Sequence, residues 1–236
     1  MNFEIHRVDV TTSTNDDVVR AAKNGAPEGY VVLAMQQKLG RGRMGRPWMS
    51  PAGNLYFSVL LKPSMPRQMW GTYSFVLAVA VGDAVKSFLP QASVELKWPN
   101  DVLVHEKKIS GILLEAVDQG LVAGIGLNVL MTPDMSRCDV TSLAEEHEAL
   151  PPFDNLLPTV LSHLDTWYAR MNAEGFAPIR KAWEVSAYRG PLRVRLPDGR
   201  NVSGTFEGLE DDGALCLKTD KGEKEKIHSG DVFAGL

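Results

Sequence analysis

Cysteine is scarce in this chain of 236 residues, which contains only Cys138 and Cys216. The two lie far apart and form no C-x-x-C pair, so the sequence predicts neither a zinc site nor a disulfide framework. A secretory signal is also missing, because no basic segment followed by an apolar run stands at the N-terminus. We therefore expect two reduced thiols in a cytoplasmic protein.

Long hydrophobic runs are absent as well. The most apolar stretch extends from Trp70 to Val85 and is interrupted by Gly71, Ser74 and Asp83. It falls short of the roughly 20 apolar residues that a membrane-spanning helix needs. We interpret it as a buried core helix and expect no membrane association.

Positive charge is not in excess, since the formal net charge is −4. Domains that bind nucleic acid broadly are usually basic, so this balance argues against such a role. Apolar and turn residues predict strands over residues 3–8, 30–35, 54–61, 94–98, 102–104, 109–117 and 121–130, and helices ending near residue 23 and over 68–89, 154–173 and 176–187. From about residue 189 the pattern changes to short strands over 192–196, 202–209, 214–219 and 225–227.

The most informative segment is the arginine-glycine loop, Gly40-Arg41-Gly42-Arg43-Met44-Gly45-Arg46-Pro47-Trp48. Its glycines permit close approach of a ligand to the backbone. Its guanidinium groups match carboxylate and phosphate oxygens in two-point contacts. The flat face of the tryptophan suits a purine. The pattern favours an anion-gripping loop that becomes ordered when its ligand binds.

Other interpretations of this loop fit less well. Gly40, Gly42 and Gly45 satisfy G-x-G-x-x-G, but Pro47 and Pro51 interrupt the helix that a dinucleotide fold requires next. The Gly-Lys-Ser/Thr of a Walker phosphate loop is absent. A solvated basic turn stays open, although three arginines and three glycines in seven positions are a costly way to build one.

A second motif, Lys97-Trp98-Pro99-Asn100-Asp101, lies between two predicted strands. Asn100 and Asp101 could orient a ligand or magnesium there, or bond their own backbone as turn residues do. Lys108 begins the next strand and could stabilise charge on a phosphoryl oxygen, and Gly111 allows a ligand close to that strand. Asn128 follows two strand glycines; it could contact an adenine edge or, more commonly, a backbone turn.

Together these motifs resemble the biotin protein ligases. The resemblance rests on the order and spacing of Ser13-Thr14-Asn15, Gln37 with the Gly40–Arg46 loop, Lys97–Asp101, Lys108–Leu113 and Gly126-Leu127-Asn128, and it covers nearly the whole chain. It implies an α+β fold, with a mixed β-sheet catalytic domain flanked by helices over 1–188 and a small SH3-like β-barrel domain over 189–236. Many relatives have Gly or Ala at the position of Ser110, a small departure.

The activity implied by the resemblance has two steps. ATP, with Mg²⁺ present, activates biotin as biotinyl-5′-adenylate, and a lysine of a biotin carboxyl carrier protein then attacks the mixed anhydride. The implied partner is the carrier of acetyl-CoA carboxylase or of another biotin-dependent carboxylase. Relatives can dimerise, sometimes only with adenylate bound, and the residues leave a homodimer open. Only about a dozen residues precede Ser13, so we expect no helix-turn-helix domain and no specific DNA binding.

The resemblance also implies roles for individual residues. Those around biotin would be Ser13, Thr14, Asn15, Gln37, Arg41, Gly42, Arg43, Lys108 and Gly111. Those around ATP or the adenylate would be Arg41, Arg43, Arg46, Trp48, Asn100, Lys108 and Asn128. Lys108, Arg43 and Asp101 would be catalytic, with Asp101 near a metal or the incoming amine.

Two alternative functions remain at this stage. A lipoate or octanoate ligase has a related fold and chemistry but is expected to lack the arginine-glycine loop. A nucleic-acid-binding module would use the basic loop and the small β domain, yet that domain is rich in acidic residues and has no aromatic stacking platform. Plain biotin binding would not need Arg43 and Lys108.

Overall fold

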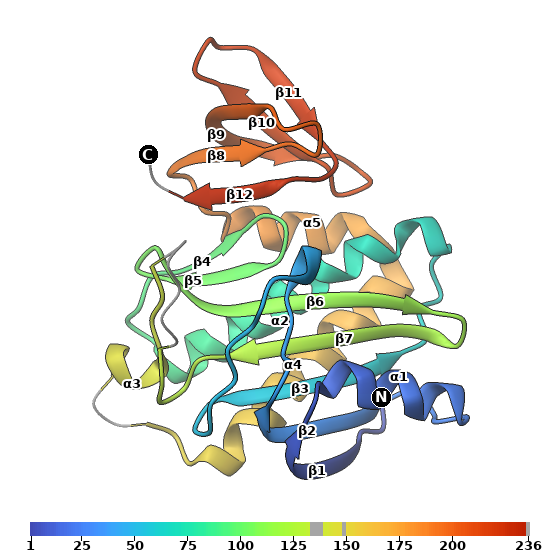
Figure 1. Ribbon diagram of the computed structural model, residues 1–236. Coiled ribbons are helices and arrows are strands. Elements are labelled where there is room, and N and C mark those ends of the chain that lie inside the picture. Colours follow the sequence, from blue (N-terminus) through green and yellow to red (C-terminus); the bar gives the residue numbers. More distant parts are fainter. Residues whose placement is uncertain (133–138, 148–149, 235–236) are drawn as a thin grey trace.

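A mixed seven-stranded sheet, in the order β1-β2-β3-β7-β6-β5-β4, organises the larger part of the chain (Figure 1). The structure is a computed structural model, and it describes residues 1–132, 139–147 and 150–234. β1 and β2 pair in parallel and the other neighbours pair antiparallel. The strands are β1 (Glu4–Thr11), β2 (Tyr30–Gln37), β3 (Leu55–Leu61), β4 (Val94–Lys97), β5 (Asp101–Val104), β6 (Lys107–Val117) and β7 (Gly120–Leu127).

Helices cover both faces of this sheet unequally. They are α1 (Thr14–Lys23), α2 (Tyr73–Phe88), α3 (Leu143–Glu146), α4 (Phe153–Glu174) and α5 (Phe176–Val185), with 3₁₀ turns η1 (Arg43–Gly45) and η2 (Arg67–Thr72). α2 and α4 lie behind the sheet in Figure 1, whereas the short α1 lies in front. The front face is therefore left partly open, and the segment between β2 and β3 crosses it.

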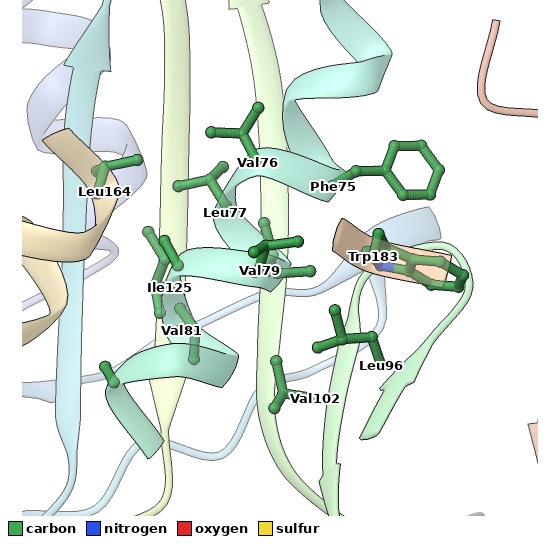
Figure 2. Packing of buried hydrophobic residues seen from close by; sticks show 14 of the residues in the cluster. Phe75, Val76, Leu77, Val79, Val81, Leu96, Val102, Ile125, Leu164 and Trp183 are labelled. Carbon is green, nitrogen blue, oxygen red and sulfur yellow. The ribbon is translucent and has the colours of Figure 1, made fainter. Parts of the chain in front are cut away.

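The apolar stretch predicted as a core helix is α2, and twelve of its 16 residues are buried. Figure 2 shows Val79 and Val81 near Ile125 and Val102 of the sheet, with Leu164 of α4 beyond. Each fully buried aliphatic side chain contributes about 1.5–3 kcal/mol, so this helix anchors the fold. No helix in the described ranges is both long and apolar enough to span a membrane.

The small C-terminal part is an open sheet, which corrects the expected closed barrel. Its order is β11-β10-β9-β8-β12, and the described residues of the edge strands β11 and β12 do not pair with each other. Its strands are β8 (Pro191–Arg195), β9 (Asn201–Leu209), β10 (Leu215–Thr219), β11 (Lys224–Ile227) and β12 (Asp231–Ala234). Its inner side chains join the main hydrophobic core, and Trp183 of α5 contacts both Phe75 and Phe206. This packing replaces closure in covering the sheet.

Most predicted elements are present, with differences at their ends. β7 stops at Leu127, before the expected residue 130, because Asn54 Oδ1 accepts the N–H groups of Val129, Leu130 and Met131. The predicted start of the long helix at residue 68 is wrong, since η2 precedes α2 there. The sequence reading missed α3 and β12, each only four residues long. Cys216 is a free thiol, and Cys138 lies outside the described residues.

Candidate active site

A cavity on the open face of the sheet gathers nearly all the predicted site residues. Its wall is built by the start of α1, the arginine-glycine loop, the turn between β4 and β5, the middle of β6 and β7, and the start of β12. The predicted residues that line it are Ser13, Thr14, Asn15, Gln37, Arg41, Gly42, Arg43, Arg46, Trp48, Asn100, Asp101, Lys108 and Gly111. Asn128 is not among them.

One end of the cavity, here called the amide end, consists of Thr14, Asn15 and Gln37 with Ser58 behind them. Gln37 Oε1 accepts the Thr14 N–H at 2.9 Å, and Gln37 Nε2 donates to Ser50 Oγ at 2.9 Å. The Thr14 and Ser58 hydroxyl oxygens are 2.7 Å apart, and Ser58 donates to Asn15 Oδ1 at 2.5 Å. Thr14 and Asn15 are each 3% exposed. These neutral groups hold one another in fixed orientations.

Arg41 lies beside the amide end but is tied to two carboxylates. Its guanidinium donates to Asp16 at 2.7 and 3.0 Å and to both oxygens of Glu115 at 2.9 and 3.0 Å. Hydrogen bonding to Asp16, then to Glu115, raises the pKa of Arg41 against the opposing effect of burial. The guanidinium predicted to close over a carboxylate or adenylate is thus directed at protein carboxylates.

The opposite end, called the cationic end, contains Arg43, Arg46, Lys97 and Lys108. The Lys108 and Lys97 ammonium groups pair with the two oxygens of Asp101 at 2.6 and 3.0 Å. Burial alone would raise the pKa of Asp101, but the charges of Lys108 and Lys97 outweigh it and lower this pKa to about 2. Asp101 is therefore a carboxylate throughout the neutral range and a poor proton acceptor.

Arg43 is the unpaired cation of this end. Its half-buried guanidinium forms no hydrogen bond or ion pair within the described part of the chain, although it lines the cavity. Burial lowers its pKa, opposed by the charges of Asp101 and Asp231. An arginine remains protonated under any ordinary condition. A desolvated, unpartnered guanidinium is therefore set to receive an anion.

The C-terminal sheet completes the cationic end, which the sequence reading missed. Arg46 forms an ion pair with Asp231 of β12, and Lys97 Nζ donates to the Val232 carbonyl at 3.3 Å. Trp98 Nε1 donates to the Gly213 carbonyl at 3.0 Å. The first two contacts hold β12 against the arginine-glycine loop and the β4–β5 turn, and the third holds the β9–β10 turn against Trp98.

Trp48 lies on strand glycines at the floor of the cavity. A Cβ added to Gly126 would be 2.5 Å from its ring, and one added to Gly111 would be 2.9 Å from it. The Lys108 ammonium is 5.2 Å from the ring centroid, a cation–π distance. The two glycines therefore make room for this side chain, and its contact with adenine stays a prediction.

The two asparagines predicted to bind the nucleotide each donate an amide N–H to a backbone carbonyl. Asn128 Nδ2 donates to the Thr141 carbonyl at 2.9 Å outside the cavity, whereas Asn128 Oδ1 is buried without a hydrogen-bond partner among the described residues. Its contact with adenine stays a prediction. Asn100 Nδ2 donates to the Ile112 carbonyl at 2.7 Å, so it fixes the β5–β6 pair beside the cavity.

The described residues do not fit a magnesium site built by the protein alone. They contain no cluster of three or more His, Cys, Asp or Glu side chains, and Asp101 already pairs with two ammonium groups.

The sequence did not predict Glu115 and Asp231 as residues near the site. Glu115 is four residues from Gly111 along β6, an even number in an alternating strand, and this spacing could have suggested that it faces the cavity side.

Comparison with known proteins agrees with this geometry. The Biotin/lipoate A/B protein ligase family matches residues 7–131, and the Biotin protein ligase C terminal domain matches residues 193–235. The chain is 35% identical to the biotin–[acetyl-CoA-carboxylase] ligase of Paracoccus denitrificans, over 95% of this chain and 98% of that protein. It is also 35% identical to the ligase of that name from Mycobacterium tuberculosis, over 94% and 85%.

Solved structures extend the likeness to three dimensions. The biotin protein ligase from Aquifex aeolicus in complex with biotin and ATP is similar with a TM-score of 0.86 and 26% identity, over 98% of this chain and 99% of that one. The ligase from Leishmania major in complex with biotinyl-5-AMP is similar with a TM-score of 0.71 and 25% identity, over 97% and 100%. From its sequence, its fold and its cavity, the chain belongs to the biotin protein ligases.

Proposed function

We propose that this chain joins biotin to AMP at the cavity and then transfers biotin to a lysine of a biotin carboxyl carrier protein. The observation that carries the proposal is one cavity with a fixed, neutral amide end and a cationic end that includes the unpaired Arg43. Biotin has a urea ring at one end and a carboxylate at the other, which matches this division. Lipoate has an apolar dithiolane ring, which would leave the amide end without partners.

In the first step an oxygen of the biotin carboxylate attacks the α-phosphorus of ATP, and the bond to the β-phosphate breaks to release pyrophosphate. We assign Arg43 and Lys108 to the charge that develops on the phosphoryl oxygens. Asp101 is assigned to holding Lys108 in place, on the basis of their 2.6 Å ion pair. Magnesium accompanying the nucleotide would be held by phosphate oxygens, which it prefers as ligands.

In the second step a neutral carrier lysine attacks the acyl carbon, AMP leaves, and the surplus proton passes to water. Asp101 is a poor candidate for that proton, because its pKa lies near 2. The carrier subunit of acetyl-CoA carboxylase is the proposed acceptor, since the relatives named above are biotin–[acetyl-CoA-carboxylase] ligases.

The test is biotin-dependent exchange of pyrophosphate into ATP by the purified chain, with lipoate and octanoate in parallel. Exchange with biotin alone supports the proposal. Exchange with lipoate or octanoate instead would assign the chain to the other activity of its broader family. Absence of exchange with all three acids would overturn adenylation as the function of this cavity.

A further inference from the structure

Glu115 lies outside the cavity yet contacts two residues that line it. This carboxylate on β6 accepts Asn15 Nδ2 at 2.5 Å and the Arg41 guanidinium at 2.9 and 3.0 Å. Its side chain is 32% exposed, whereas Asn15 and Ser58 are almost fully buried. Neither the motifs nor the relatives' names assign it any task.

The charge of Glu115 decides which way the Asn15 amide faces. A carboxylate only accepts hydrogen bonds, so the Asn15 NH₂ group must face it and the Asn15 oxygen must face Ser58. Oxygen and nitrogen of an amide are assigned from their partners, and here the reversed orientation would place an oxygen against an anion. Ser58 must therefore give its only hydroxyl proton to Asn15.

The same order continues to the cavity. Because the Ser58 hydroxyl already donates its proton to Asn15, it can only accept a hydrogen bond from the Thr14 hydroxyl, whose oxygen is 2.7 Å away. Thr14 has one proton and its distance to Gln37 Oε1 is longer, 3.1 Å. Thr14 Oγ1 is then left with lone pairs for a ligand. Gln37, whose oxygen accepts from Thr14 N and whose NH₂ donates to Ser50, keeps one N–H to offer.

We propose that Glu115 is a positioning residue that sets the hydrogen-bond direction of the amide end, so that Thr14 accepts and Gln37 donates, and thereby selects a ligand edge with N–H beside C=O. The inference rests on the proposed function in one respect, that the ligand is biotin. A cyclic urea presents such an edge. A ring in which oxygen replaces that N–H presents two acceptors and is rejected.

The test compares biotin with its cyclic carbamate analogues, in which a ring oxygen replaces one or the other ureido N–H. In Glu115→Gln the Asn15 amide can reverse, because glutamine can also donate. We expect the biotin KM to rise about tenfold and the preference for biotin over the disfavoured carbamate to fall about tenfold, with kcat and the ATP KM unchanged. Ser58→Ala breaks the same chain of hydroxyls and should lower the preference in the same direction.

Glu28→Gln is the matched control, since Glu28 is also half-buried and hydrogen-bonded, to Tyr168 and the Lys62 N–H, away from the cavity. Glu28→Gln should lower the free energy of unfolding without changing the preference for biotin over the carbamate. If calorimetry shows that the wild type binds biotin, but Glu115→Gln and Ser58→Ala both keep the wild-type preference for biotin over the carbamate, the inference about Glu115 is overturned and the proposed function is not. A wild type that binds no biotin would overturn the proposed function together with it.

Discussion

The two ends of the cavity solve opposite electrostatic problems. Beside the neutral amide end, Arg41 pairs with two carboxylates, Asp16 and Glu115, so its charge is fully matched. At the cationic end four cations, Arg43, Arg46, Lys97 and Lys108, face two carboxylates, Asp101 and Asp231, among the residues that the structure describes. A saturated network favours recognition of shape and hydrogen-bond direction, whereas surplus positive charge favours an anion that arrives and changes during the reaction.

The largest effect is expected at the cationic end. Lys108→Ala should slow adenylate formation by about 100- to 1,000-fold, because a donor aimed at developing charge is lost. Biotin binding should weaken much less, as the amide end is untouched. Single-turnover pyrophosphate release and biotin calorimetry separate the two. Lys107→Ala, at the exposed neighbouring position, is the control; equal losses of binding and rate in Lys108→Ala would contradict its catalytic role.

Asp101→Asn tests how strongly the carboxylate of Asp101 stabilises the fold against the positive charge of Lys97 and Lys108. Removing this buried carboxylate leaves Lys97 and Lys108 uncompensated, so the free energy of unfolding should fall by about 3 kcal/mol at pH 7. The Asp101 pKa of about 2 lies below the ordinary value of 3.8, so its stabilisation is complete above about pH 4 and is lost as pH falls toward 2.

Urea unfolding of both proteins at pH 7 and pH 3 measures this difference. The gap between wild type and Asp101→Asn should narrow at the lower pH. The exposed Asp154→Asn serves as control, since its carboxylate makes only a surface ion pair. A gap that is constant with pH would show that the charge of Asp101 is not what stabilises the fold.

Arg43→Gly tests whether the unpaired guanidinium retains the adenylate. We expect the adenylate to dissociate about 100-fold faster, because a hydrogen bond to a charged group contributes up to about 3 kcal/mol. Bystander proteins should then become biotinylated. Met44→Gly, the next residue, with φ of 57°, adds loop freedom without removing charge. Labelling that stays confined to the carrier in Arg43→Gly would contradict the retention role.

The smallest effects are expected from two substitutions on β7, Gly124→Ala next to the amide end of the cavity and Gly126→Ala next to Trp48. A Cβ on Gly124 would be 2.1 Å from Asn15 Oδ1, whereas a Cβ on Gly126 would be 2.5 Å from Trp48. Overpacking of this kind costs about 1–3 kcal/mol.

Gly124→Ala should therefore raise mainly the biotin KM and Gly126→Ala mainly the ATP KM, each about tenfold. Steady-state kinetics with each substrate varied gives both values. Gly71→Ala is the control, because a Cβ there meets nothing within 4 Å. If both β7 variants changed the same KM, the division into two ends would be wrong.

Local sequence was enough to locate the loop, the turn and most of the helices and strands. Glycine, proline and capping residues act on their immediate neighbours, so their effect can be read from spacing. The buried nature of α2 followed from its apolar run for the same reason. Resemblance to a family then placed Ser13, Arg43 and Lys108 around one ligand.

Long-range pairing decided the rest. Glu115 meets Arg41 across 74 residues of sequence, and Arg46 meets Asp231 through the C-terminal sheet; no spacing rule connects such partners. Whether the small sheet closes depends on its edge strands meeting, and the core shared with α5 covers it instead. Spacing also could not predict the protein partners of Arg41, which are Asp16 and Glu115, or that of the Asn128 amide nitrogen, which is the Thr141 carbonyl. A buried polar group takes the partners that the fold supplies, and the ligand contacts of both residues stay predictions.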